Sequence, residues 1–316
     1  MTGKERIIKA LKHEPITGHV PHFELVFYLT MESIGKVHPL HREFSQWDQM
    51  SVKEKEHQLS DAADCYILTA EKYKHSAILV FPLINEFNTI RRLLEIIREK
   101  SGDEYFLFMH GDSTFSIPDG DDMMDFSVRM YEDPDSLIDE SKRRTDEQLE
   151  FARKLQGTGL LDCFGLCSDY CYNTNPFFSN EMFEKFIVGP LGDVIAGYRE
   201  MGYYSIKHTD GNIMPILEQM VACKPDALHS LDPQGGVDLA EVKSLVGDRV
   251  ALIGNVNCGL LQTGTDEEVI ADVKRSLNQG MPGGGYIFST SNCAYTGLPL
   301  ERYELMHKIW REYGIY

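Results

Sequence analysis

The chain lacks any long run of apolar residues. Its first residues, MTGKERIIKALKHEP, alternate charged and apolar side chains and contain neither a signal-peptide core nor a membrane-spanning segment. Of its 316 residues, 42% are hydrophobic and 25% are charged, as in average globular proteins, and no low-complexity tract indicates disorder. We therefore expect a cytoplasmic protein with a sizeable packed core.

Positive charge is also scarce. Lys and Arg number 31 against 49 Asp and Glu, which gives a formal net charge of −18. A field of this sign repels polyanions, so nucleic acid and anionic membranes are disfavoured as partners. It also counts against a substrate that carries many carboxylates.

The seven cysteines show no pattern typical of a disulfide framework or a zinc ribbon. Their number is odd, none forms a CxxC pair, and a chain of this length needs no disulfide scaffold. We therefore expect free thiols, some of them as candidate metal ligands.

No Pro/Ser-rich linker divides the chain, and no GxGxxG follows the first predicted strand, which argues against an open doubly wound sheet, the alternative fold. Short apolar runs, each followed by a turn and a segment with helical apolar spacing, recur eight times. Helix starts are marked by Thr265 with Glu268, by Asp238 with Glu241, and by Pro299. This pattern predicts one domain over residues 1–316, a (β/α)8 TIM barrel with helical excursions in the first 60 or so residues. The predicted strands are 19–27, 77–82, 105–111, 160–167, 203–208, 227–231, 250–256 and 286–291.

Polar residues that follow the strands are the candidates for an active site, because active sites of such barrels lie at the carboxyl ends of the strands. Asp169, His229 and Glu24 are the candidates for acid and base catalysis. His229 with Asp232 is also readable as a hydrogen-bonded pair, and Asp169 as a loop cap. The candidate substrate-binding residues are aromatic or amide side chains, which suit a flat ring with a polar substituent: Tyr170, Tyr172, Asn173, Phe27, Asn255, Asn292 and Tyr295.

Four of these segments carry a family resemblance. IKHTDGN (206–212), DALHSLDP (226–233), ALIGNV (251–256) and STSNCAY (289–295) resemble the uroporphyrinogen decarboxylase superfamily, and in particular its corrinoid-dependent methyltransferase branch. The opening KERIIKALKHEPIT followed by VPHFE resembles the first helix and first strand of that family. The resemblance implies the same barrel over nearly the whole chain.

The segment after the first strand distinguishes between the two chemistries of that superfamily. The decarboxylases carry an arginine-rich stretch there, which grips the carboxylates of the porphyrinogen, whereas this chain has FELVFYLTMESIG, without arginine. We therefore expect a methyltransferase. A decarboxylase or lyase acting on a small non-porphyrin acid is the alternative, and a non-enzymatic binding protein is a third hypothesis.

The resemblance also implies a metal site. The methyltransferase branch has a His-x-Cys pair and a later Cys that hold zinc, and the matching positions here are His208, Asp210 and Cys293. An aspartate in place of a thiolate makes the ion a stronger Lewis acid, better suited to an oxygen leaving group than to a thiol. Alternatively, His208 and Asp210 are metal-free hydrogen-bonding residues.

Together these features predict an O-demethylase-like enzyme. It would move a methyl group from a small, methoxylated aromatic substrate to the Co(I) corrinoid of a separate corrinoid protein, since this chain shows no module of its own to carry a corrinoid. The sequence does not identify the methyl donor. It also does not determine the oligomeric state, for which a homodimer is one option.

Overall fold

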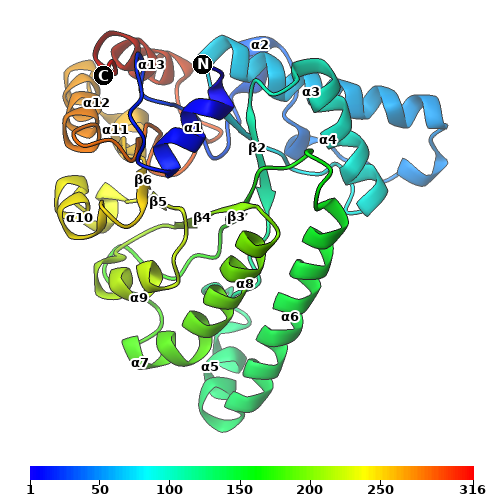
Figure 1. The fold of residues 1–316 in the computed structure, drawn as a ribbon, viewed down its shortest axis with the longest axis vertical. Coiled ribbons are helices and arrows are strands. Elements are labelled where there is room, and N and C mark those ends of the chain that lie inside the picture. The colour runs from blue at the N-terminus through cyan, green and yellow to red at the C-terminus, as the bar shows by residue number, and fades with distance from the viewer.

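A sheet of seven parallel strands forms the centre of the computed structural model, which describes residues 1–316 (Figure 1). The strands pair in chain order, and each is followed by at least one helix that packs outside the sheet. The architecture confirms the predicted barrel fold. The strands are β1 (Ala77–Leu79), β2 (Phe106–His110), β3 (Cys163–Leu166), β4 (Tyr204–Thr209), β5 (Ala227–Ser230), β6 (Ala251–Ile253) and β7 (Tyr286–Ile287).

Residues 19–27, predicted as the first strand, lie between the two edge strands of this sheet. Phe288, after β7, donates its backbone N–H to Pro21, and Ser76, before β1, donates to His22. Pro21 has no N–H to donate, so the segment makes single bridges and not a continuous ladder. It therefore takes the eighth place in the barrel as an irregular strand.

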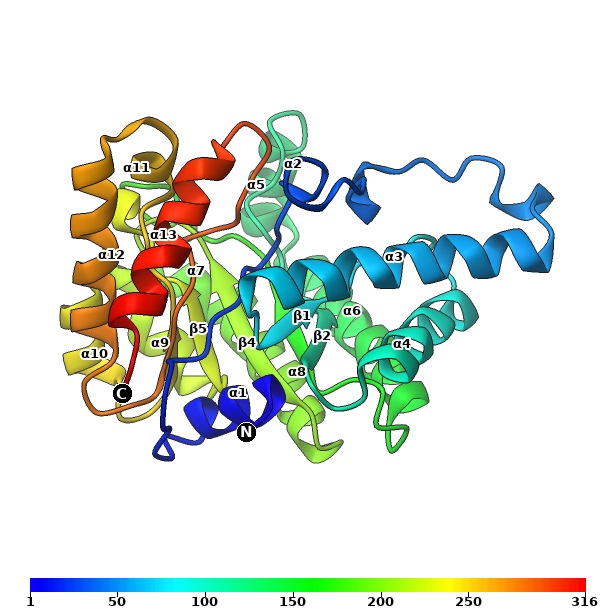
Figure 2. The ribbon, with the colours of Figure 1, turned by 90° about the horizontal axis from the view of Figure 1, so that it is seen from above.

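The helices cover the outside of the sheet, as Figures 1 and 2 show. The predicted helix starts are present: Thr265 and Glu268 form a capping box, Asp238 accepts the Glu241 N–H, and Pro299 directly precedes the last helix. The longer helices are α1 (Gly3–Leu11), α3 (Val52–Tyr73), α4 (Phe87–Ser101), α5 (Met123–Glu132), α6 (Pro134–Leu155), α8 (Gly189–Glu200), α10 (Leu239–Val246), α12 (Asp266–Gly280) and α13 (Leu300–Tyr313). The shorter ones are α2 (Thr30–Ile34), α7 (Asn180–Phe183), α9 (Leu217–Ala222), α11 (Cys258–Thr263), a π-helical turn at Glu184–Val188, and 3-10 turns at Pro39–His41, Trp47–Gln49, Met214–Ile216 and Pro233–Gly235.

Two apolar clusters make up the core. The inner cluster fills the barrel with 16 buried residues, among them Ile7 and Leu11 of α1. Helix α1 lies along the lower edge of the barrel in Figure 2. The outer cluster packs the sheet against the helices. Because side chains alternate along a strand, Ile206 of β4 points inward, Lys207 points outward and His208 points inward again. This alternation aims His208 at the barrel axis.

The excursion predicted near the N-terminus is also present. The segment after α2 and much of α3 extend beyond the barrel, to the right in Figure 2. None of the helices combines the length and the apolar character needed to cross a membrane.

Candidate functional site at the carboxyl ends of the strands

Two buried histidines lie side by side at the ends of β4 and β5. His208 and His229 are register partners in the sheet, and their Nδ1 atoms are 2.7 Å apart. At this distance one ring donates an N–H and the other accepts, so at least one of the two is neutral. Burial lowers the pKa of His208 to about 4, so its imidazole is neutral at physiological pH. In the tautomer that donates its Nδ1–H to His229, the lone pair of Nε2 is free to bind a metal.

Two carboxylates converge on the other nitrogen of His208. Asp169 follows β3 and Asp210 follows β4, and their Oδ1 atoms lie 3.7 and 3.8 Å from His208 Nε2. These separations are too long for hydrogen bonds. Two ligands of one zinc ion, each bound at about 2.0–2.2 Å, lie at most about 4.4 Å apart, so the observed distances suit a shared ion.

The charges in this group also favour a cation. The ligand atoms of Asp169, His208 and Asp210 all lie within 4.8 Å of one another. Burial, with the nearby Asp169 charge, raises the pKa of Asp210 to about 7. A bound cation would stabilise the ionised form of both carboxylates.

An unpaired buried atom also belongs to this group. Asp210 Oδ2 accepts a hydrogen bond from Asn292 Nδ2 at 2.5 Å, but Oδ1, the atom that faces His208, has no partner. Leaving such an atom unpaired costs about 1–3 kcal/mol, a cost that a bound ligand removes. The residues present therefore fit a divalent metal ion.

Cys293 does not belong to this group, which has Asp169 in its place. Asn292, the preceding residue, turns toward Asp210 instead. Burial raises the pKa of the Cys293 thiol to about 12. The three side chains that the structure brings together are thus Asp169, His208 and Asp210, and the predicted set of His208, Asp210 and Cys293 stays a prediction.

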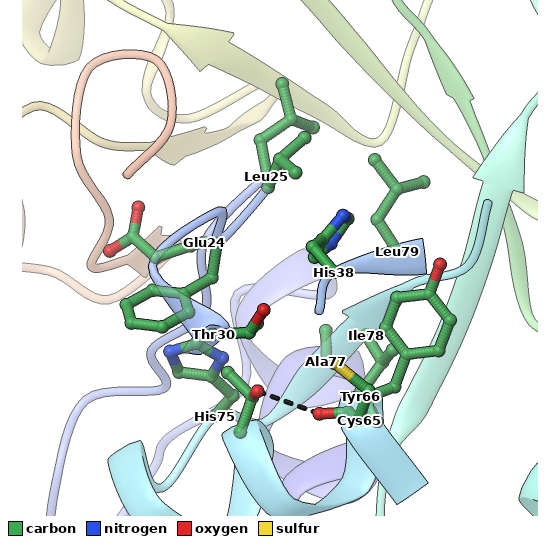
Figure 3. Close-up of a pocket in the computed structure, with 13 residues that line it drawn as sticks. Glu24, Leu25, Thr30, His38, Cys65, Tyr66, His75, Ala77, Ile78 and Leu79 are labelled. Carbon is green, nitrogen blue, oxygen red and sulfur yellow. Dashed lines mark hydrogen bonds between the residues drawn. The ribbon is translucent and has the colours of Figure 1, made fainter. Parts of the chain in front are cut away.

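Glu24, at the end of the irregular first strand, lies beside a small cavity. Its Oε2 accepts the Thr290 hydroxyl at 2.5 Å, while Oε1 is buried without a partner. The cavity has a volume of about 30 Å³, has room for one or two water molecules, and is also lined by Phe27, Thr30 and His38. Figure 3 shows Glu24, Thr30 and His38 among the side chains around it. Burial raises the pKa of Glu24 to about 8. Glu24 therefore holds a proton at neutral pH, as a general acid must.

His229 and Asp232 are not paired with each other. His229 bonds to His208, whereas Asp232 accepts the Gln234 N–H and caps the turn after β5. The interpretation of His229 and Asp232 as a hydrogen-bonded pair is therefore wrong. His229 instead contacts the Nδ1 atom of His208, on the side of the ring opposite the two carboxylates.

The predicted substrate-binding residues lie in three different settings. Tyr170 and Asn255 are fully buried, and their polar atoms bond to protein partners such as Thr114 and Leu231. Phe27 is buried against other aromatic rings but lines the cavity at Glu24. The remaining four reach the surface or the site loops: Tyr172, Asn173, Asn292 and Tyr295.

The sequence comparison decides the family. A model described as uroporphyrinogen decarboxylase (URO-D) matches residues 90–313. The chain belongs to the uroporphyrinogen decarboxylase family. Within this family's barrel, the match spans the strands from β2 to β7 and so includes Asp169, His208 and Asp210. No curated protein sequence matches the chain significantly.

Solved structures agree on the fold of this family member. A methyltransferase from Methanosarcina mazei superposes with a TM-score of 0.73 at 17% sequence identity, over 99% of each chain. A GH5_18 from Bifidobacterium longum subsp. infantis superposes with a TM-score of 0.51 at 12% identity, over 95% of this chain and 80% of that one. At these identities the likeness establishes the fold alone.

Proposed function

We propose that this chain is a methyltransferase that passes a methyl group from a small methylated compound to the Co(I) corrinoid of a separate protein. The observation that carries the proposal is the group of Asp169, His208 and Asp210 at the strand ends, with Asp210 Oδ1 buried and unpaired. Family membership and the methyltransferase with the same fold support it.

The polar groups at the barrel mouth suit an electron-rich leaving atom. In the reaction the bond between the methyl carbon and oxygen breaks, its electron pair stays on the oxygen, and the carbon bonds to cobalt. A zinc ion on Asp169, His208 and Asp210 would supply a Lewis acid for that oxygen. His229 holds the His208 ring in place through the Nδ1 contact of 2.7 Å. Glu24, protonated at neutral pH, supplies a proton donor.

Porphyrinogen decarboxylation does not suit the same groups. Residues 23–35 contain no arginine, and the mouth presents two carboxylates where a substrate with several carboxylates would need cations. We therefore propose a small methylated compound as the donor, and a methoxylated aromatic is the first class to test. Because Phe27 and Tyr170 are buried, the aromatic contribution must come from rings nearer the surface, such as Tyr172 and Tyr295.

The test is a spectroscopic assay of the purified, zinc-supplemented chain. A corrinoid protein reduced to Co(I) is mixed with a methoxybenzoate or with methanol, and absorbance is followed for conversion of Co(I) to methyl-Co(III). We expect conversion with the native chain and at least a 100-fold slower rate with Asp210→Asn, a loss typical of removing one electrostatic group from a reaction centre. Absence of conversion with every donor, together with release of CO2 from a small acid, would establish a decarboxylase instead.

A further inference from the structure

A buried ion pair contacts the two residues that flank Asp169, and the proposed function does not use it. Lys207 Nζ is 3.0 Å from Asp112 Oδ2, and the two side chains are 0% and 8% exposed. A buried ion pair is often no more stabilising than an apolar pair of similar volume, because both charges lose their hydration. Stability alone therefore does not account for this pair.

Lys207 contacts both neighbours of Asp169. Its Nζ donates to the Ser168 carbonyl oxygen at 2.8 Å and lies 3.9 Å from the centre of the Tyr170 ring. Asp112 Oδ2 in turn accepts the Ser168 N–H at 2.9 Å. The pair thus holds the Ser168 backbone on one side of Asp169 and contacts the Tyr170 ring on the other.

Asp112 also ties the loop after β2 to the loop after β3. Its Oδ1 accepts the Thr114 N–H at 2.8 Å, and the Thr114 hydroxyl lies 2.6 Å from the Tyr170 hydroxyl. Ser116, farther along the same loop, accepts the Asp169 N–H at 3.0 Å. The two loops therefore form one hydrogen-bonded unit around the ion pair.

We propose that the Lys207–Asp112 pair positions Asp169, by holding Ser168 and Tyr170 so that the carboxylate between them reaches the metal site 3.7 Å from His208 Nε2. This inference rests on the metal site of the proposed function. Lys207 and Asp112 act as positioning residues, since neither is among the three ligands.

A double-mutant cycle on zinc affinity tests the inference, with zinc binding by the full-length chain measured by competition with a chelator. The pair variant, Lys207→Met with Asp112→Asn, removes both charges and leaves no unpaired one. We expect it to lower zinc affinity about 10- to 100-fold, as loss of outer-shell support typically does. In an Asp169→Asn background the same pair variant should lower affinity no further, because its effect passes through Asp169 alone.

A similarly buried ion pair at the other end of the strands provides the control. Arg98 and Asp162 lie 2.6 Å apart, each 11% exposed, beside the first residues of β2 and β3. Arg98→Met with Asp162→Asn should leave zinc affinity unchanged. Amide hydrogen exchange in metal-free protein gives a second readout: residues 168–170 should exchange faster in the Lys207/Asp112 variant and unchanged in the control.

The outcomes separate this inference from the proposed function. Native chain that binds no zinc would overturn the metal site and the inference with it. If the pair variant binds zinc as tightly as the native chain, the inference alone is overturned. The same holds if the pair variant lowers zinc affinity by the same factor in the native chain and in the Asp169→Asn background. If the pair variant does not fold, Thr114→Val, which removes the contact between the Thr114 and Tyr170 hydroxyls, replaces it in the same cycle with the same expected non-additivity.

Discussion

Glu24→Gln should change how the stability of the protein depends on pH. Glu24 is 4% exposed, and burial raises its pKa from 4.5 to about 8. Glutamine keeps an oxygen to accept the Thr290 hydrogen bond, and its amide nitrogen can take the place of Oε1, which has no partner and borders the cavity in Figure 3. The substitution therefore removes the titration and disturbs the packing little.

The sign follows from the proton bound in each state. Below pH 4.5 the folded and unfolded states both hold the Glu24 proton, so the carboxyl has its full stabilising effect. Between pH 4.5 and about 8 only the folded state holds it, and the free energy of unfolding falls by about 1.4 kcal/mol per pH unit as the pH rises. Above pH 8 the loss is complete, and it amounts to on the order of 5 kcal/mol.

Urea denaturation at a series of pH values measures this effect. The difference in unfolding free energy between Glu24→Gln and the native chain should grow in favour of the variant from pH 4.5 to 8. Glu32→Gln, on the exposed surface of α2, is the matched control and should follow the native curve. Parallel pH curves for Glu24→Gln and the native chain would refute the assignment of a protonated, buried Glu24.

Three further substitutions distinguish residues that affect zinc affinity from residues that affect only the stability of the fold. His229→Ala removes the hydrogen-bond partner of a proposed ligand and should lower zinc affinity about 10- to 100-fold in a chelator competition. Gly211→Ala adds a Cβ 2.6 Å from a backbone oxygen at a φ of +78°, so it should destabilise the fold in urea more than Gly236→Ala, which has a φ of +75° and open space. Equal losses would argue against the clash. Thr265→Ala removes the α12 cap and should cost about 1 kcal/mol in urea while zinc affinity stays constant.

The fold was predictable because its signals are local. Alternating strand and helix patterns fix a parallel sheet, and capping residues such as Thr265 and Asp238 mark helix starts without any tertiary information. The first strand is the exception. Pro21 lies within a strand-like apolar run and breaks its hydrogen-bond ladder, which leaves single bridges.

The site was predictable only in part, because strand ends show which residues gather but not which side chains turn toward one another. Asp169, His208 and Asp210 were all named from the sequence, but only two of them as ligands. The choice between Cys293 and Asp169 depends on the paths of two loops. Lys207 had one signal, a lysine inside the apolar run YYSIKH, but its partner Asp112 lies 95 residues away in the chain.

Anomalous diffraction at the zinc edge, from crystals of the zinc-loaded full-length chain, tests the central claim most directly. The account predicts one zinc ion bonded to His208 Nε2 and to a carboxylate oxygen of both Asp169 and Asp210, at about 2.0–2.2 Å. Zinc bonded to Cys293 in place of Asp169, or no ion between these three side chains, would contradict it.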